Sequence, residues 1–246
     1  MKFIDQNFVF ISDIMKDIET GVMMPAPMQR PYAWSLEDVE ALANSMIEGI
    51  PIGSFLLWRP NDKDLFQEAP LERLGPLCAC SDRPQAMILD GHNRLASLAW
   101  LVDERTPEDS SDRELEIFRS GRTLVIDGTD FKARFVADEE VSTGLRMPFS
   151  VALSTRGNSG GAIRSLWKRA EETGFPEKEI GYFLERYGQI EENIRNSRSV
   201  VTTLISDDRE VARNAFLGIC RAGVPMTRED FDRAVNWLHD SHSPSL

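Results

Sequence analysis

The chain has 246 residues, 41% hydrophobic and 28% charged, which is typical of a globular protein with one large domain or two small ones. Its formal net charge of −12 argues against non-specific binding to DNA or RNA, which depends on lysine and arginine. Three cysteines form no disulfide framework and no apolar run is long enough to span a membrane, so we expect a cytoplasmic protein.

The N-terminal part predicts short strands alternating with helices. Ser35 and Asp38 form a capping-box pattern, so a helix is expected directly after Ser35. The continuous apolar run Ser54–Trp58 predicts a central strand, because a strand covered on both faces need not alternate. The expected elements, in order, are a strand at Phe8–Ile11, a helix at Asp13–Thr20 capped by Ser12, an extended segment at 25–32, a helix at Leu36–Glu48 and the strand at Ser54–Trp58.

The next part of the chain predicts a long loop and then a strand, an abrupt turn and a helix. Residues 59–84 are polar and rich in proline, which indicates a surface loop with at most a minor strand. Met87–Leu89 is short enough for a buried strand, and Asp90-Gly91 is a turn signal. Leucines at 95, 98 and 101 then follow a helical period. Such a turn presents free backbone N–H groups at the positive end of the helix, which is a seat for phosphate.

Four polar side chains lie at this turn, namely Asp90, His92, Asn93 and Arg94. Arg94 can donate to two oxygens of a phosphate. Asp90 can hold a metal ion, orient a water or cap the helix. In the alternative interpretation Asp90 only caps the helix and Arg94 forms a surface salt bridge, and the motif alone leaves both open.

The C-terminal part of the chain becomes increasingly helical. Acidic residues concentrated at 104–116 and 137–140 indicate solvated faces. The expected elements are strands at Thr123–Ile126 and Lys132–Val136, an extended piece at Phe149–Leu153, helices at Ile163–Thr173 and Pro176–Tyr187, the latter open to extension through Glu191–Asn196, a strand at Ser199–Leu204, a helix opened by Asp207 and Glu210, and a last helix opened by Thr227 and Asp230.

Four segments resemble the motifs of one family. Gln29–Trp34 resembles its Gln-Arg-Pro-Tyr-x-Trp opening, Ile50–Ser54 its Pro-Ile-Gly entry into a strand, and Leu89–Leu95 its Ile-Asp-Gly-Gln-Gln-Arg-Leu signature. Ala215–Thr227 resembles its Phe-x-x-Leu-Asn-x-x-Gly-x-Pro-Leu-Ser segment. The family is the N-terminal domain of GmrSD-type restriction systems, which is a member of the ParB/sulfiredoxin-like superfamily.

The resemblance implies an α+β fold. Residues 1–155 are expected to form a ParB-like mixed sheet with helices, and residues 156–246 a mainly helical region that packs over the nucleotide pocket, although the two can form one continuous domain. The resemblance further implies binding, with possible hydrolysis, of a nucleoside triphosphate, and a role in restriction and defence against phage. Mg²⁺ is the expected cofactor, with Asp90 as its metal ligand.

The functional residues carry over position by position. Asp90, Gly91 and Arg94 match the family motif, whereas His92 and Asn93 replace its two glutamines and Cys220 replaces an asparagine. The candidate catalytic residues are therefore Asp90, His92 and Arg94, with His92 as a possible general base. The candidate nucleotide-binding residues are Gln29, Arg30, Tyr32, Gly53, Gly91, Asn93 and Arg94. Trp34 is expected to pack in the core, and Arg30 can alternatively pair with a surface acid.

Two other functions compete with nucleotide hydrolysis. The departures at His92 and Cys220 favour a non-catalytic regulatory or protein-interaction module for a separately encoded nuclease. Direct DNA binding is the third, and the acidic charge opposes it. We do not expect nuclease activity from this chain, because two of its three histidines, His239 and His242, lie near its end and a histidine–metal site cannot be built in the usual way.

Overall fold

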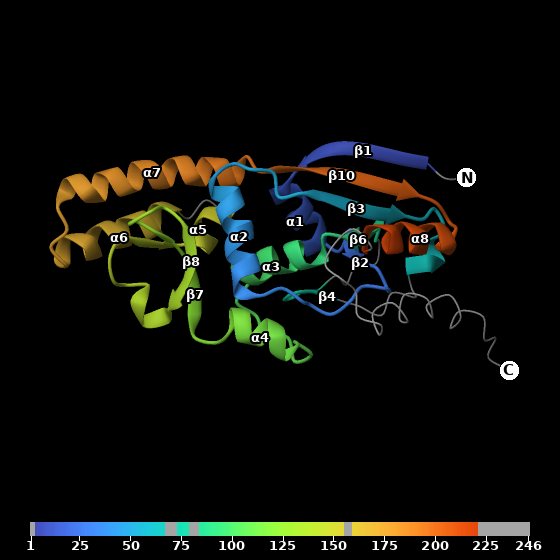
Figure 1. Ribbon diagram of the computed structural model, residues 1–246, viewed down its shortest axis with the longest axis horizontal. Helices are drawn as coiled ribbons and strands as arrows, with labels where there is room; N and C mark the ends of the chain where they lie inside the picture. The colour runs from blue at the N-terminus through green and yellow to red at the C-terminus, as the bar shows by residue number, and fades with distance from the viewer. Residues whose placement is uncertain (1–2, 67–72, 79–83, 155–158, 221–246) are drawn as a thin grey trace.

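The computed structural model describes residues 3–66, 73–78, 84–154 and 159–220, and it has the α+β architecture expected (Figure 1). Its main sheet is mixed and has the strand order β1-β10-β3-β6-β2. Two neighbouring pairs, β10 with β3 and β2 with β6, are parallel, and the other pairs are antiparallel. The bounds are β1 Phe3–Phe10, β2 Met23–Pro25, β3 Ser54–Arg59, β6 Ala86–Asp90 and β10 Arg198–Ile205.

Helices cover both faces of this sheet. On one face lie α1 (Ile11–Glu19), α2 (Leu36–Ile47) and α3 (His92–Val102), which share the larger apolar core with it. On the other face α8 (Arg209–Cys220) packs with a second apolar cluster that includes Trp58, Met87 and Leu204. Alternate residues of β3 and β6 therefore serve opposite cores, which is why both strands read as continuous apolar runs.

A second group of elements lies at the other end of the molecule, away from α8 (Figure 1). Its antiparallel sheet has the order β8-β7-β9 and packs against α2 and α5, and α5 in turn packs against α6 and α7. The longest helix, α7, is followed directly by β10, so the main sheet takes strands from both of the predicted regions. The bounds are β7 Arg122–Asp127, β8 Ala133–Ala137, β9 Arg146–Pro148, α5 Phe149–Leu153, α6 Ser159–Glu172 and α7 Glu177–Arg195.

Several expected elements are confirmed. The capping box of Ser35 and Asp38 begins α2, and β3 is the central strand of the main sheet. Residues 59–84 contain two short strands where at most one minor strand was expected, and the segment is not purely a surface loop, because Leu65 and Leu74 are buried. Its short elements are η1 Lys63–Phe66, β4 Arg73–Leu74 and β5 Leu77–Cys78. The last predicted helix lies outside the described residues.

Two local predictions are wrong, and some short helical elements were missed. Residues 149–153 form the helix α5, because Phe149 and Ala152 are buried at helical spacing directly after Pro148. Ser12 caps nothing, since β1 continues to Phe10 and α1 begins at Ile11. Three short helical elements were not predicted, namely η1, α4 Asp112–Phe118 and η2 Asp138–Glu140.

The start of α8 also differs from the predicted capping box. Asp207 accepts hydrogen bonds from the backbone N–H groups of Asn61 and Asp62, and so ties the segment after β3 to the segment after β10. The backbone N–H of Glu210 is bound by Asp208 instead. None of the helices in the described ranges is both long and apolar enough to cross a membrane.

Candidate functional site

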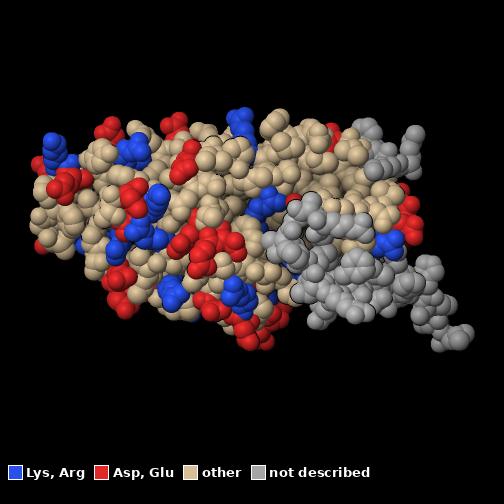
Figure 2. All heavy atoms as spheres, in the orientation of Figure 1, with Lys and Arg blue, Asp and Glu red and all other residues tan. Residues whose placement is uncertain are grey.

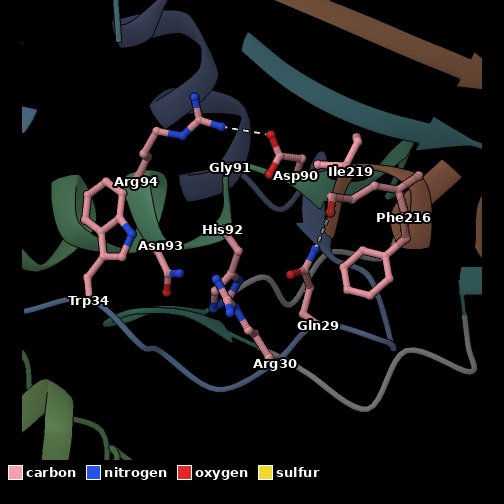
Figure 3. A pocket seen from close by; sticks show the side chains of 11 residues that line it. Gln29, Arg30, Trp34, Asp90, Gly91, His92, Asn93, Arg94, Phe216 and Ile219 are labelled. Atoms are coloured by element: carbon pink, nitrogen blue, oxygen red, sulfur yellow. Dashed lines mark hydrogen bonds and ion pairs between the residues drawn. The ribbon is translucent and has the colours of Figure 1, made fainter. Parts of the chain in front are cut away.

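A cavity of about 190 Å³ lies where β6 ends and α3 begins (Figure 3). Its walls come from the extended segment between β2 and α2, from the turn between β6 and α3, and from the inner face of α8. The lining residues are Gln29, Arg30, Trp34, Leu89, Asp90, Gly91, His92, Asn93, Arg94, Phe216 and Ile219. The chain thus brings together parts of three of its four motifs, and the expected return of the helical region to the pocket is present at Phe216.

The turn itself requires glycine. Gly91 precedes the first residue of α3 and has a φ of 98°, and a Cβ there would lie 2.2 Å from a ring carbon of Phe55. The turn therefore places His92, Asn93 and Arg94 in the first turn of α3. Among the described residues, none accepts a hydrogen bond from their backbone N–H groups, which are free for an anion at this end of the helix.

The guanidinium of Arg94 is held by its own protein. It donates to the carbonyl oxygens of Ile52 and Ser54 and to the carboxylate of Asp90, at 2.8, 2.8 and 2.9 Å. It also lies 4.8 Å from the ring centre of Phe55. In Figure 3 it points toward Asp90 and away from Arg30. The salt bridge of the alternative interpretation is thus present, although Arg94 is mostly buried and Asp90 does not cap α3.

Gly53 serves this arrangement and does not line the cavity. Its φ is 93°, and a Cβ there would lie 2.3 Å from Nη1 of Arg94. Glycine therefore lets the backbone at 52–54 approach the guanidinium closely enough for both carbonyl bonds. Gly53, which was predicted to bind the nucleotide, is thus placed against Arg94 of the motif turn.

The guanidinium of Arg30, unlike that of Arg94, is not held by hydrogen bonds within the described part of the protein. Within the described residues no hydrogen bond or ion pair engages its guanidinium, so the pairing with a surface acid is not present there. Its side chain reaches the same part of the cavity as His92 (Figure 3). Burial lowers the pKa of His92 to about 4, and the positive charges of Arg30 and Arg73 act in the same direction against the opposing effect of Glu114. His92 is therefore neutral at pH 7, and its Nδ1 is buried without a hydrogen-bond partner.

Gln29 and Asn93 hold the walls in place. Gln29 is buried and donates from Nε2 to the carbonyl oxygens of Ile88 and Leu89, at 2.7 and 2.9 Å. Asn93 accepts from the backbone N–H of Ala33 at 3.2 Å. Nε2 of Gln29 and Oδ1 of Asn93 thus each connect the segment before α2 to the end of β6 or to the β6–α3 turn. Their other amide atoms face the space around Arg30 and His92 (Figure 3).

Tyr32 is the one predicted binding residue whose side chain the structure places behind the cavity wall. It is buried, its hydroxyl lies 2.6 Å from that of Ser97, and its ring meets the edge of Phe118. Burial raises the pKa of this hydroxyl well above its ordinary value. Trp34, which was expected to pack in the core, packs against the core and also lines the cavity.

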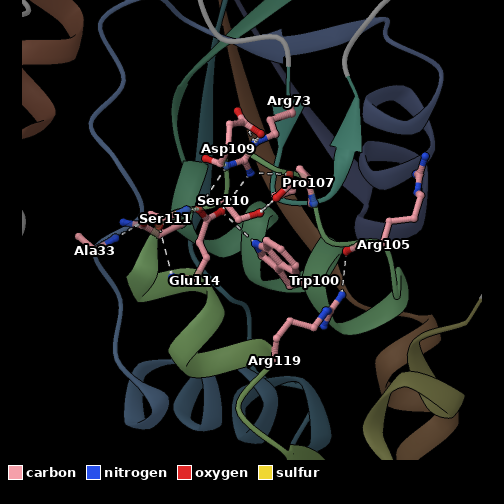
Figure 4. A network of polar contacts seen from close by, with 12 residues as sticks. Ala33, Arg73, Trp100, Arg105, Pro107, Asp109, Ser110, Ser111, Glu114 and Arg119 are labelled. Atoms are coloured by element: carbon pink, nitrogen blue, oxygen red, sulfur yellow. Dashed lines mark hydrogen bonds and ion pairs between the residues drawn. The ribbon is translucent and has the colours of Figure 1, made fainter.

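A buried ion-pair network under α3 was missed by the sequence analysis (Figure 4). Glu114 of α4 is 5% exposed and accepts from Arg73, from Nε1 of Trp100 and from Ser111. The interpretation of residues 104–116 as a solvated face is thus wrong for Glu114. The signal was present, because Ser111 and Glu114 form a capping box.

The metal expectation rests on a single carboxylate. In the described part of the chain no three His, Cys, Asp or Glu side chains converge as a metal site. One oxygen of Asp90 is bound by Arg94, which leaves the other for a ligand. Residues 221–227 of the fourth motif lie outside the described residues.

The model of the family described as "GmrSD restriction endonuclease, N-terminal domain" matches residues 11–235. The chain belongs to this family. Membership associates this GmrSD N-terminal domain with restriction systems and phage defence. The domain is also similar to an uncharacterized protein of Methanocaldococcus jannaschii, with 29% identity over 94 residues, which are 37% of this chain and 16% of that protein. The match thus spans less than a fifth of that relative's length.

Proposed function

We propose that this GmrSD N-terminal domain binds a nucleoside triphosphate in the cavity at the β6–α3 turn. The observation that carries the proposal is the guanidinium of Arg30, which faces the cavity and is engaged by no other described residue. The free N–H groups at the start of α3 lie on the same cavity. A half-buried cation and a helix N-terminus together favour a polyanion over a neutral ligand.

In this proposal the two arginines have different roles. Arg30 binds phosphate oxygens directly. Arg94 positions the turn by holding Asp90 and the segment at 52–54. Gln29 and Asn93 place their remaining amide atoms for the ligand, and Trp34 offers a partly exposed ring that a base can stack on.

Mg²⁺ fits the site only as a companion of the nucleotide. Asp90 would hold it through the carboxylate oxygen that Arg94 leaves free, and it would screen phosphate charge. One protein carboxylate suffices in such a case, because Mg²⁺ usually keeps several waters and takes phosphate oxygens as ligands.

Hydrolysis requires a water and an acceptor for its proton. Asp90 can orient the water, and neutral His92 can accept the proton while the water oxygen bonds to the terminal phosphorus and the bond to the leaving phosphate oxygen breaks. A pKa of about 4 makes His92 a weak base, but a phosphate beside it raises that pKa.

A non-catalytic regulatory module is the second candidate. The departures of His92 and Cys220 from the family motif favour it, because binding depends on Arg30, which matches the motif, whereas hydrolysis depends on the residues of the turn, where His92 stands in place of a glutamine. Such a module would bind the nucleotide and regulate a partner nuclease. Direct DNA binding is disfavoured by the net charge of −12.

The test is a thermal-shift titration with ATP, GTP, CTP and UTP, each with and without Mg²⁺. A ligand that binds only the native state raises the melting temperature. We expect at least one nucleotide to stabilise the wild type and not Arg30→Gln. Arg122→Gln, an exposed arginine at the start of β7, is the matched control and should respond like the wild type.

No shift with any nucleotide, or an equal shift with Arg30→Gln, would refute the proposed site. A phosphate-release assay with the stabilising nucleotide then separates the two candidates. Release that His92→Ala abolishes supports hydrolysis with His92 as the base, and binding without release supports the regulatory module. A shift with duplex DNA instead of nucleotides would favour the third function.

A further inference from the structure

The strand β1 is an unprotected edge of the main sheet. It pairs with β10 over all eight residues without a bulge, and no described segment pairs with its outer side. Proteins usually protect such an edge with proline, lysine, a bulge or a covering segment. Residues 3–10 contain neither proline nor lysine, and Asp5 is their one charged residue. Such an edge is a template for another strand.

Two large apolar side chains lie exposed on this strand. Phe8 is 80% exposed and Ile4 is 52% exposed. Because they are four residues apart, they share one face of β1. Ile4 is opposite Leu204, which packs in the α8-side cluster, so this is the face that α8 covers farther along the sheet. On the side seen in Figure 2, the surface over β1 and β10 carries few charged side chains.

The outward backbone groups belong to the same residues. The N–H of Ile11 donates to the carbonyl of Ser197, which continues the β1–β10 register. In an antiparallel ladder, residues alternate between those bonded to the neighbour and those facing away from it. Ile4, Gln6 and Phe8 therefore direct their N–H and C=O groups to the free edge.

We propose that β1 pairs with β1 of a second copy of this chain, antiparallel about a two-fold axis at Gln6, which joins the two main sheets into one. In this register Ile4 lies opposite Phe8 of the partner subunit, and Gln6 lies opposite Gln6 of the partner subunit. Asp5 lies opposite Asn7 of the partner subunit, an amide that can donate to its carboxylate. Moving the axis to Asp5 would instead place the two Asp5 carboxylates opposite each other, which is destabilising.

The exposed area predicts a reversible dimer. A phenylalanine carries roughly 150–250 Å² of surface, so Phe8 and Ile4 together offer on the order of 200 Å² in each copy. Even with the paired backbones, the buried area stays below the roughly 1,200 Å² in total at which stable specific interfaces begin. Each copy also has a net charge of −12, so salt that screens this repulsion should strengthen association.

This inference is independent of nucleotide binding. β1 precedes residue 11, where the match to the family model begins, and none of its residues lines the cavity. A failure to bind nucleotide would therefore not count against dimerisation through β1, and a failure to dimerise would not count against nucleotide binding.

The experiment is sedimentation velocity of the full chain over a wide range of concentration and at two salt concentrations. We expect a concentration-dependent dimer that tightens with salt. Phe8→Lys should raise the dissociation constant roughly tenfold or more, because a charge then lies in the paired face. Ile50→Lys, at a residue exposed to a similar 50%, is the matched control and should dimerise like the wild type.

Cross-linking tests the register. Gln6→Cys places two thiols opposite each other across the axis, at a spacing that a disulfide can span. We expect an oxidised dimer with Gln6→Cys and not with Ile50→Cys. A wild type that stays monomeric at every concentration overturns the proposal, and so does a dimer that Phe8→Lys leaves unchanged while circular dichroism shows the variant to be folded.

Discussion

At the scale of single residues, the two arginines of the cavity differ in what already engages them. Arg94 donates to two carbonyls and a carboxylate, whereas Arg30 is engaged by none of the described residues. A guanidinium with satisfied donors stabilises the fold, and one without them is available to a ligand. The fold should therefore depend on Arg94 and the binding of an anion on Arg30.

The first prediction is that Arg94→Ala destabilises the chain by about 2–4 kcal/mol, because it leaves Asp90 and two carbonyls without their donor. Urea unfolding at pH 7 measures the change. Arg30→Ala is the control and should lie within about 0.5 kcal/mol of the wild type. Equal losses in the two variants would contradict the assigned roles.

The second prediction concerns the pH dependence of stability. The pKa of His92 is about 4 in the folded chain and about 6.5 when unfolded, so between these values only the unfolded chain binds the proton. The stability that comes from keeping His92 neutral in the folded chain is therefore fully present above pH 6.5, and it is lost as the pH falls toward 4. In urea unfolding the wild type should therefore lose about 1–3 kcal/mol more than His92→Gln over this range. Parallel pH profiles would show that burial does not hold His92 neutral.

The sequence predicted where the cavity residues would lie better than it predicted their roles. A short apolar run, Asp90-Gly91 and a helical leucine period sufficed for the strand, turn and helix. The role of Arg94 was not predictable, because its partners at 52–54 lie about forty residues away and are backbone atoms. Tyr32 was misplaced for a similar reason, since its hydroxyl is bound by Ser97 inside the core.

At the scale of elements, α3 is held from below by α4. The carboxylate of Glu114 accepts hydrogen bonds from Arg73 and from Trp100 of α3, and it also accepts one from the hydroxyl of Ser111. Burial opposes ionisation of Glu114, but these hydrogen bonds outweigh it and lower its pKa below the ordinary value. The carboxylate therefore stabilises the fold at neutral pH, and this contribution is lost as the pH falls through the lowered pKa.

The third prediction is that Glu114→Gln costs about 2–4 kcal/mol at pH 7, because Arg73 loses its buried partner. The loss should shrink in acid, where the wild-type carboxylate also becomes protonated. Glu116→Gln on the same helix changes an exposed side chain and should cost less than about 0.5 kcal/mol. Urea unfolding at neutral and acidic pH decides, and a loss that did not vary with pH would contradict the charged state of Glu114.

Elements with a clear start signal and period were predictable, and those defined by tertiary contacts were not. The capping box of α2 and its apolar face were both visible in the sequence. The corresponding box of α4 was masked by a run of acidic residues. Residues 149–153 read as extended because five residues are too few to distinguish a helical from a strand period.

At the scale of the whole molecule, the main sheet is completed by residues far apart in the chain. β10 lies between β1 and β3, so the cavity wall formed by β6 depends on a strand that follows α7. The sequence predicted this strand from a β-branched run, but strand order depends on long-range pairing that no local pattern encodes. Ligand binding at the β6–α3 turn should therefore raise the stability of the main sheet as a unit.

The measurement that tests the central claim most directly is calorimetric titration of the wild type, Arg30→Gln and Arg122→Gln with the nucleotide that gives the largest thermal shift. The proposal predicts saturable binding to the wild type and Arg122→Gln, and binding at least about tenfold weaker to Arg30→Gln, because a charged hydrogen bond is lost. Undiminished binding to Arg30→Gln, or none to the wild type, would contradict it.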